Sequence, residues 1–283
     1  MTIAASFCCS DGVVLCADSQ LTFPEMLKYA DSKLRIGKDL RCVPVFVFCG
    51  DIDYQKQCSS HFLAALSEAE REGRSLQAAL EASALEMHRT YYEAYPNPED
   101  KLQASMFVSV FTGTRRTVHK IWGPKVSVVE RMECLGAGMY LAQSLSSTYW
   151  EFGNDMKRTA LAATYILSDV KRYVDGCGGS SQIICLSNKG DQSMYAQDSL
   201  FRVDPIGMIE NRYQVWKQRF GALLMDFQDY RMSHLDFEER LSRLSEHLLE
   251  IRKERTDYYD DAEFQEIHAQ TQALRESEED AES

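Results

Sequence analysis

Short apolar runs separated by turn residues occupy the first fifty positions of the chain. Runs of this kind, bounded by turn residues, are typical of β-strands. We therefore expect two hairpins here, and we place Gly12 at a turn position that needs a positive φ. The strands predicted for these hairpins span residues 2–9, 13–19, 29–36 and 41–49.

Longer segments with helical periodicity follow, and they alternate in pairs with further strands. Leu76, Leu80 and Ala84 recur every four residues, which places them on one face of a helix. Pairs of helices between groups of antiparallel strands are typical of an α+β fold, in which two sheets pack together and helices cover both outer faces. We expect helices over residues 54–72, 75–95, 136–149 and 155–174, and strands over residues 105–111, 117–122, 125–134, 182–187 and 193–197.

The composition changes after Pro205, where strand signals stop. Residues 208–275 are predicted to be almost wholly helical, with a heptad-like apolar spacing that can support a coiled coil. Two arrangements stay open: a helical hairpin folded back on the globular body, or a helix that binds a partner. The predicted domains are residues 2–204, a helical extension over residues 205–275, and an acidic, disordered tail over residues 276–283. The apolar seam of the extension is formed by Phe237, Leu241, Leu244, Leu248, Ile251 and Tyr258.

Net charge and cysteine content limit the kinds of function and the cellular location that we expect for the chain. The 283 residues carry a formal net charge of -12 and no clustered basic surface, which argues against nucleic-acid binding. We find no signal peptide and no apolar run long enough for a membrane helix, so we expect no membrane partner. The nine cysteines follow no disulfide framework and are expected to be reduced, which favours a cytoplasmic location. Metal-ligand spacings such as Cys-x-x-Cys are missing, so neither a metal nor another cofactor is expected.

Thr2, Asp18 and Lys33 form the candidate catalytic set. A threonine hydroxyl becomes nucleophilic when a base takes its proton. If Met1 is removed, the α-amino group of Thr2 becomes that base, with an ordinary pKa of about 7.7–8.0 that suits neutral pH. A Lys–Asp pair beside the amine would keep it unprotonated, because a nearby cation disfavours a second positive charge. No histidine is then required, and the six histidines fit no serine-hydrolase motif.

The register of the first hairpin decides which side chain faces Thr2. A three-residue loop would pair Asp18 with Ala4 and place Asp18 on the face of Thr2. A two-residue loop would place Ser19 there instead, since a slip of one residue exchanges the two faces of a strand. The sequence leaves both registers open.

The opening pattern Thr-Ile, Asp-Gly-Val-Val-Leu, Ala-Asp-Ser and Lys resembles the start of proteasome β-type subunits and their bacterial proteasome-like relatives, which are N-terminal-nucleophile (Ntn) hydrolases. The resemblance covers about residues 2–200 and implies a four-layer αββα sandwich of the Ntn-hydrolase type. It places the family's motif acid at Asp18 and, within one residue, its catalytic lysine at Lys33. It also implies a substrate-binding threonine at Thr22 and, at Gly50, a glycine whose N–H stabilises the oxyanion.

Supporting positions depart from the pattern of that family. Ala137, within Gly136-Ala137-Gly138, stands where the family has a serine that helps to position the terminal amine. The segment from Asp175 to Gly179 is one residue shorter than its counterpart and has Cys177 in place of a serine. With no histidine near it in the sequence, Cys177 is expected to be a buried turn cysteine rather than a nucleophile. Ala137, Asp175 and Cys177 are the supporting residues of the predicted site.

The resemblance implies a threonine endopeptidase that hydrolyses polypeptides and assembles with copies of itself into a ring or compartment. An unfoldase or a helical partner is a further candidate partner. Two other functions stay open: a non-catalytic scaffold that binds a partner through the C-terminal helices, and an Ntn amidase that acts on small amides. A mixed set of side chains is expected beside the nucleophile and predicts no clear cleavage preference. This set is Arg35, Phe48, Ile52 and Lys56.

Overall fold

The computed structural model of the chain divides into two compact units, Met1–Glu210 and Asn211–Ser283. The structure describes residues 2–22, 28–37, 39–50, 52–94, 105–188, 194–195, 205–228, 236, 238–246 and 249. Among these residues every strand lies before residue 196, so the first unit carries the sheets. The predicted division at residues 204 and 275 stays a prediction.

The first sheet has five antiparallel strands in the order β10-β1-β2-β11-β12. Every residue of β2 is buried, and so are five of the six residues of β1, because other layers cover both faces of this sheet. Continuous apolar runs are expected for strands of this kind. The strands are β1 (Ile3–Cys8), β2 (Gly12–Asp18), β10 (Met132–Gly136), β11 (Ser181–Ser187) and β12 (Met194–Tyr195).

The second sheet also has five antiparallel strands, in the order β5-β6-β7-β8-β9. A separate antiparallel pair, β3 with β4, stands between β2 and β5 in the chain. The strands are β3 (Gln20–Thr22), β4 (Lys28–Ala30), β5 (Leu34–Ile36), β6 (Val45–Cys49), β7 (Ser105–Phe111), β8 (Arg116–Trp122) and β9 (Lys125–Val128).

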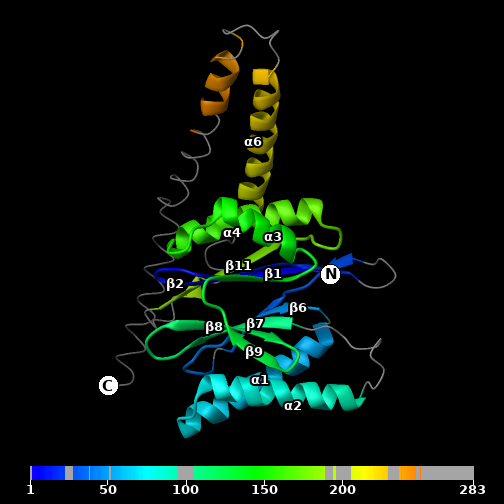
Figure 1. Cartoon of the computed structure of the whole chain (residues 1–283), viewed down its shortest axis with the longest axis vertical. Coiled ribbons are helices and arrows are strands. Elements are labelled where there is room, and N and C mark those ends of the chain that lie inside the picture. Colours follow the sequence, from blue (N-terminus) through cyan, green and yellow to red (C-terminus); the bar gives the residue numbers. More distant parts are fainter. Residues whose placement is uncertain are drawn as a thin grey trace. The chain divides into compact units, whose positions relative to one another are not determined.

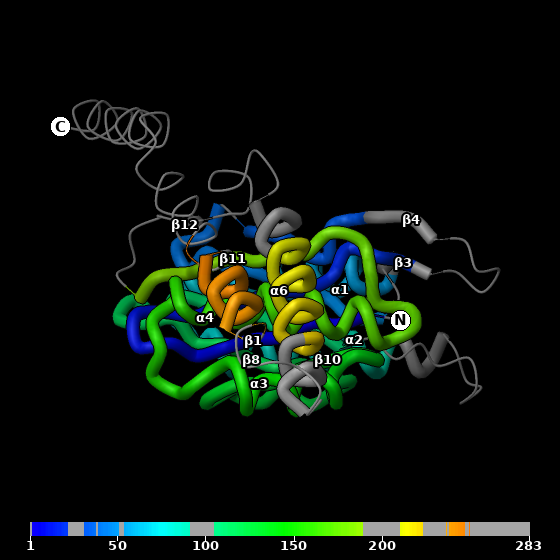
Figure 2. Tube along the Cα trace, turned by 90° about the horizontal axis from the view of Figure 1, so that it is seen from above, coloured from blue at the N-terminus to red at the C-terminus, as the bar shows by residue number. Residues whose placement is uncertain are grey.

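Two helices lie against the outer face of each sheet, as Figure 1 shows. Helices α3 (Met139–Tyr149) and α4 (Met156–Tyr173) pack on the sheet that contains β1, and Figure 2 shows them over that strand from above. Helices α1 (Ile52–Glu72) and α2 (Leu76–Ala94) pack on the sheet that contains β6. The predicted α+β class, with two antiparallel sheets, is confirmed.

Three clusters of buried apolar side chains fill the spaces between these sheets and helices. Ile3 and Phe7 lie in the cluster beneath α3 and α4, whereas Ala4 lies in the cluster between the two sheets. This alternation along β1 follows from the two-residue period of a strand. In the same way Val47 faces the other sheet, while Phe48 lies in a third cluster with α1 and α2.

Three expectations about strands and turns are wrong. The strand expected over residues 29–36 is two strands in different sheets, β4 and β5, because the N–H groups of Ser32 and Lys33 between them bond to side chains and not to a neighbouring strand. The strand expected over residues 125–134 is two strands in different sheets, β9 and β10, because the exposed residues Glu130 and Arg131 lead the chain from one sheet to the other. Gly12 does not adopt a positive φ. Space requires glycine there instead, since an added Cβ would lie 2.2 Å from the carbonyl oxygen of Leu186 on β11.

The second unit is helical where the structure describes it. It contains most of α6 (Pro205–Gln228), in which Trp216 and Phe220 stack with ring centroids 5.2 Å apart. Of the predicted apolar seam, Leu244 is buried and Leu241 is exposed. The other seam residues, Phe237, Leu248, Ile251 and Tyr258, and the predicted acidic tail lie outside the described residues.

No helix among the described residues combines the length and apolar character that crossing a membrane requires. The same part of the chain holds no cluster of His, Cys, Asp or Glu side chains arranged to bind a metal ion.

Candidate functional site

Thr2 lies immediately before β1 and is buried, with 3% of its surface exposed. Its carbonyl oxygen accepts a hydrogen bond from the backbone N–H of Gly138 at 3.3 Å. Gly136, which pairs with Ile3, has a φ of +94°, and an added Cβ there would lie 2.2 Å from the same carbonyl oxygen. Both the backbone angle and the close approach therefore require glycine beside Thr2.

Asp18 is the last residue of β2, and its carboxylate is fully buried. Oδ1 accepts the Thr2 hydroxyl and the backbone N–H of Ile3, the latter at 3.0 Å. Oδ2 accepts the backbone N–H of Gly178 at 2.8 Å. A buried carboxylate needs such donors, because removing a charge from water without partners is costly.

Lys33 is also buried, and its ammonium group completes the cluster. Nζ donates to Asp18 Oδ1 at 2.6 Å, to the carbonyl oxygen of Gln20 at 2.7 Å, and to the Thr2 hydroxyl oxygen. Burial lowers the pKa of Lys33 from its ordinary value, and the nearby Asp18 carboxylate opposes that shift. The Thr2 hydroxyl thus lies between a carboxylate and a lysine whose proton is less firmly held than usual.

Backbone bonds fix Lys33 to both sheets. Its N–H donates to Gln182 Oε1 at 2.8 Å, and its carbonyl oxygen accepts the N–H of Phe48 at 3.0 Å. Gln182 belongs to β11 of the first sheet and Phe48 to β6 of the second. The lysine therefore lies where the two sheets meet.

The observed hairpin has the register of the two-residue loop. Ala4 pairs with Ala17, and the N–H of Cys9 donates to the carbonyl oxygen of Gly12. By strand alternation this register would turn Ser19 towards the face of Thr2. Asp18 nevertheless bonds to Thr2, because Thr2 precedes β1 and is not held by its pleat.

Two buried thiols border the cluster. Cys177 lies near Asp18 and Lys33, and burial raises its pKa to about 12. Burial likewise raises the pKa of Cys49 to about 11. Thiols with such values are neutral at physiological pH, so their chemistry differs from that of reactive cysteines.

The remaining predicted site residues are less closely joined to this cluster. Gly50 follows β6, is exposed and has a φ of +117°, a backbone angle that favours glycine, and its expected function stays a prediction. Thr22 ends β3, and its side chain lies outside the described part of the structure. Ala137 and Asp175 are exposed, and no contact recorded among the described residues joins the Asp175 side chain to Thr2, Asp18 or Lys33.

The side chains expected beside the nucleophile fall into two groups. Arg35 lies on β5 and donates through Nη1 to the carbonyl oxygen of Lys56 at 3.1 Å and to two serine hydroxyls of α1. Lys56 also pairs with Asp31 at 3.6 Å. Phe48, in contrast, is buried under α1, and the side chain of Ile52 lies outside the described set.

Sequence reasoning missed three residues that hold the cluster: Gly178, Gln20 and Gln182. Gly178 lies in the shortened segment from Asp175 to Gly179 and was given no function of its own, yet its N–H binds Asp18. An added Cβ there would lie 2.4 Å from Gln20 Oε1. The signal available in the sequence was the Gly-Gly pair, one residue before the strand β11, which permits close approach of two backbones.

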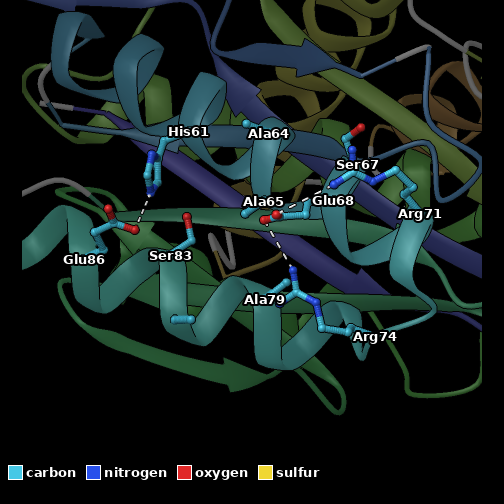
Figure 3. Close-up of a pocket in the computed structure, with 11 residues that line it drawn as sticks. His61, Ala64, Ala65, Ser67, Glu68, Arg71, Arg74, Ala79, Ser83 and Glu86 are labelled. Atoms are coloured by element: carbon cyan, nitrogen blue, oxygen red, sulfur yellow. Dashed lines mark ion pairs between the residues drawn. The ribbon is translucent and has the colours of Figure 1, made fainter.

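A hollow between α1 and α2 is separate from this cluster (Figure 3). Small side chains such as Ala65 and Ala79 line it, and ion pairs cross it, among them His61 with Glu86 at 3.3 Å. Its lining includes none of Thr2, Asp18 and Lys33.

Comparison with known proteins gives structural relatives alone. No model of a known protein family matches the chain, and no curated protein matches it. The structure is similar to that of Anbu, an ancestral β-subunit, from Yersinia bercovieri, with a TM-score of 0.65 and 12% identity over 82% of this chain and 100% of that chain. It is also similar to a Gly-1 mutant of Anbu from Hyphomicrobium sp. strain MC1, with a TM-score of 0.61 and 13% identity over 79% of this chain and 99% of that chain.

These findings correct the assignment to the family of proteasome β-type subunits and their bacterial relatives. That assignment is wrong, since no family model matches and the similar structures are Anbu proteins at 12 and 13% identity. A few positions in the opening strands were too little to define a family. What the chain shares with the Anbu structures is a proteasome-like fold.

Proposed function

We propose that the chain is a threonine-type peptidase whose nucleophile is the hydroxyl of Thr2. One observation carries this proposal: Thr2 Oγ1 contacts both Lys33 Nζ and Asp18 Oδ1 in a buried cluster. A hydroxyl that only filled space would not need a buried ion pair around it, because burying charges is costly.

The proposed reaction begins with removal of Met1, which frees the α-amino group of Thr2. That amine accepts the hydroxyl proton while Oγ1 attacks the carbonyl carbon of the scissile peptide bond. The backbone N–H of Gly50 stabilises the negative charge that develops on the carbonyl oxygen. The proton then passes to the leaving amine as the C–N bond breaks. Water, activated by the same amine, hydrolyses the ester formed on Thr2 and restores the hydroxyl.

Lys33 supports this reaction through its charge and its lowered pKa. Its ammonium group contacts Thr2 Oγ1 and so favours the developing alkoxide. Asp18 holds Lys33 by the contact at 2.6 Å. Burial lowers the pKa of Lys33, so it shares its proton with the hydroxyl more readily than an exposed lysine would.

The finer architecture belongs to the same proposal. A four-layer αββα sandwich of the Ntn-hydrolase type, followed by a helical extension from residue 205, agrees with the packing of paired helices on both sheets. We further propose a polypeptide substrate and assembly with copies of the same chain. Size measurement in solution, by light scattering, tests the assembly independently of activity.

The test of the proposed function combines processing with activity. Mass spectrometry of the purified protein should show Thr2 at the amino terminus, and a peptide vinyl sulfone should label the Thr2 hydroxyl. Thr2→Ala should abolish hydrolysis of a panel of fluorogenic peptides, whereas Thr2→Ser should retain part of it. Thr90→Ala, at an exposed threonine on α2, is the matched control and should leave hydrolysis unchanged. Retention of Met1 in active protein would refute the mechanism.

One observation favours a non-catalytic scaffold instead. Ala137 supplies no hydroxyl, and Asp175 is exposed, so neither provides a partner for the amine of Thr2. If no peptide and no small amide is hydrolysed by correctly processed protein, the scaffold becomes the better account. Hydrolysis of small amides but not of peptides would support the amidase.

A further inference from the structure

One carboxylate near the start of α6, that of Glu210, contacts residues close to the candidate site. Glu210, on α6, is the last residue of the first unit, and 14% of its side chain is exposed. It accepts hydrogen bonds from Lys171 Nζ at 2.7 Å and from the hydroxyl of Ser181. The Lys171 side chain is 12% exposed, so this ion pair is shielded from water and is worth more than a surface pair.

Both partners of Glu210 are connected to the segment that holds Asp18: Ser181 is part of it, and Lys171 bonds to it. Ser181 opens β11 and pairs directly with Asp18 across the sheet. Lys171 also donates to the carbonyl oxygen of Gly179 at 3.2 Å. Glu210 thus ties down residues 179 and 181, one through Lys171 and the other directly.

The backbone bonds of this segment run to the residues after β2: the carbonyl oxygens of Gly178 and Ser180 accept the N–H groups of Gln20 and Ser19 at 3.0 and 2.9 Å. Gly179 has a φ of +72°, and it adjoins a second glycine, Gly178, so the backbone here is intrinsically free. The same segment donates the N–H of Gly178 to Asp18 at 2.8 Å, and Gln182 accepts the N–H of Lys33. A shift of the segment would therefore move the acid and the lysine together.

We propose that Glu210 is a positioning residue, which fixes residues 178–182 and thereby sets the geometry of Asp18 and Lys33 around Thr2. The catalytic part of this inference rests on the proposed peptidase function. It has a consequence for control: a partner that displaces Glu210 from Lys171 and Ser181 would lower activity without touching the nucleophile.

The first experiment measures the anchor without any need for activity. Hydrogen exchange read by mass spectrometry should show peptides covering residues 176–182 exchanging about tenfold faster in Glu210→Gln than in the parent. Lys171→Met should act on the same peptides, and the double variant should add little, since both changes break one network. Glu239→Gln, which breaks an exposed pair with Arg243, is the control and should leave these peptides unchanged.

The second experiment measures catalysis with fluorogenic peptides. Glu210→Gln should lower kcat by about 10- to 100-fold with little change in KM, because misplaced catalytic groups affect the reaction step rather than binding. A melting curve recorded first shows that the variant is folded, and Glu210→Ala provides a stronger loss of the same contacts.

The outcomes separate the two proposals. If the parent hydrolyses nothing, the proposed function fails, and faster exchange of residues 176–182 in Glu210→Gln on a Thr2→Ala background still supports the anchor. Unchanged exchange in folded Glu210→Gln and Glu210→Ala overturns the anchor, even if the parent is an active peptidase. An unchanged kcat together with faster exchange overturns the catalytic part of the inference.

Discussion

Replacing Asp18 by asparagine removes the negative charge from the centre of the buried cluster while keeping its shape. Lys33 Nζ, which lies 2.6 Å from Asp18 Oδ1, then has no opposite charge in contact among the described residues. The lysine must either stay charged without a partner or lose its proton. Both outcomes destabilise the folded state, and the cheaper one sets the size of the effect.

The structure allows two independent estimates of that size. Breaking a buried ion pair by removing one partner costs about 3–5 kcal/mol. Neutralising a lysine of ordinary pKa 10.5 at about pH 7.5 spans three pH units, each worth about 1.4 kcal/mol, and since burial already lowers the pKa of Lys33 in the folded parent, the loss relative to the parent is at most about 4 kcal/mol. Both estimates allow a loss of about 3–4 kcal/mol, which corresponds to a fall in Tm of about 6–16 °C for a chain of this size.

The pH dependence identifies the lysine as the cause. Burial lowers the pKa of Lys33, and the Asp18 carboxylate opposes this shift, so Asp18→Asn lowers the pKa of folded Lys33 further. Between the folded pKa of the variant and that of the parent, the unfolded variant binds a proton that the folded variant does not. In this window the stability of the variant rises with pH relative to the parent, by up to about 1.4 kcal/mol per pH unit.

Urea unfolding at a series of pH values, followed by circular dichroism, measures both effects. The double variant Asp18→Asn with Lys33→Met also removes the buried lysine that has lost its carboxylate partner, so it should be more stable than Asp18→Asn alone. If Asp18→Asn unfolds like the parent at every pH, or if Lys33→Met adds its own full cost to it, then the ion pair does not hold the site as described.

Three further predictions concern residues around and beyond this cluster. Gly136→Ala should lower the free energy of unfolding in urea more than Gly113→Ala does. Both glycines have positive φ, but only at Gly136 would the new Cβ meet a backbone atom, the carbonyl oxygen of Thr2, at 2.2 Å. The difference between the two losses measures the cost of this close approach, and equal losses would contradict it. Cys177→Ala should keep kcat/KM for peptides within about threefold, because a thiol with a pKa of about 12 is almost never ionised at neutral pH; loss of all activity would instead make Cys177 the nucleophile. Burial lowers the pKa of His119 below its ordinary value of 6.5, so as the pH drops below about 6.5 the unfolded chain takes up a proton before the folded chain does, and the stability of the fold should fall. Thermal melts of His119→Gln at a series of pH values should show a smaller loss of stability in this range. An unchanged pH profile would exclude the histidine as the source of the loss.

Local sequence signals predicted the elements better than the contacts between them. Strand β7 occupies the predicted residues 105–111, and α1 and α2 lie within two residues of their predicted bounds. Their apolar periodicity is local, so the sequence carries it directly. The segment over residues 125–134 failed because its apolar pattern is continuous through a crossing between two sheets, and periodicity does not report which sheet a strand joins.

The site shows the same division. The chemical types of Thr2, Asp18 and Lys33 pointed to one cluster, and the structure brings these three together. The glycine that donates to Asp18 was not foreseen, because Gly178 is 160 residues away in sequence. A contact of that range depends on how β11 enters the sheet, which no local pattern specifies.

The convergence of distant residues on one point follows from the order of the strands. In an antiparallel pair the start of one strand lies beside the end of the other. The start of β1 therefore lies beside the end of β2, which brings Thr2 to Asp18, and the start of β11 lies beside the same end of β2, which brings Gly178 and Ser181 there. Lys33 comes from the other sheet, where it directly precedes β5. The site is thus an edge at which strand ends from both sheets meet. Residues at strand ends do not have to follow the alternation of side chains along the strand, so they can bond to residues on the other face. This explains why Asp18 reaches Thr2 although the hairpin register turns it away.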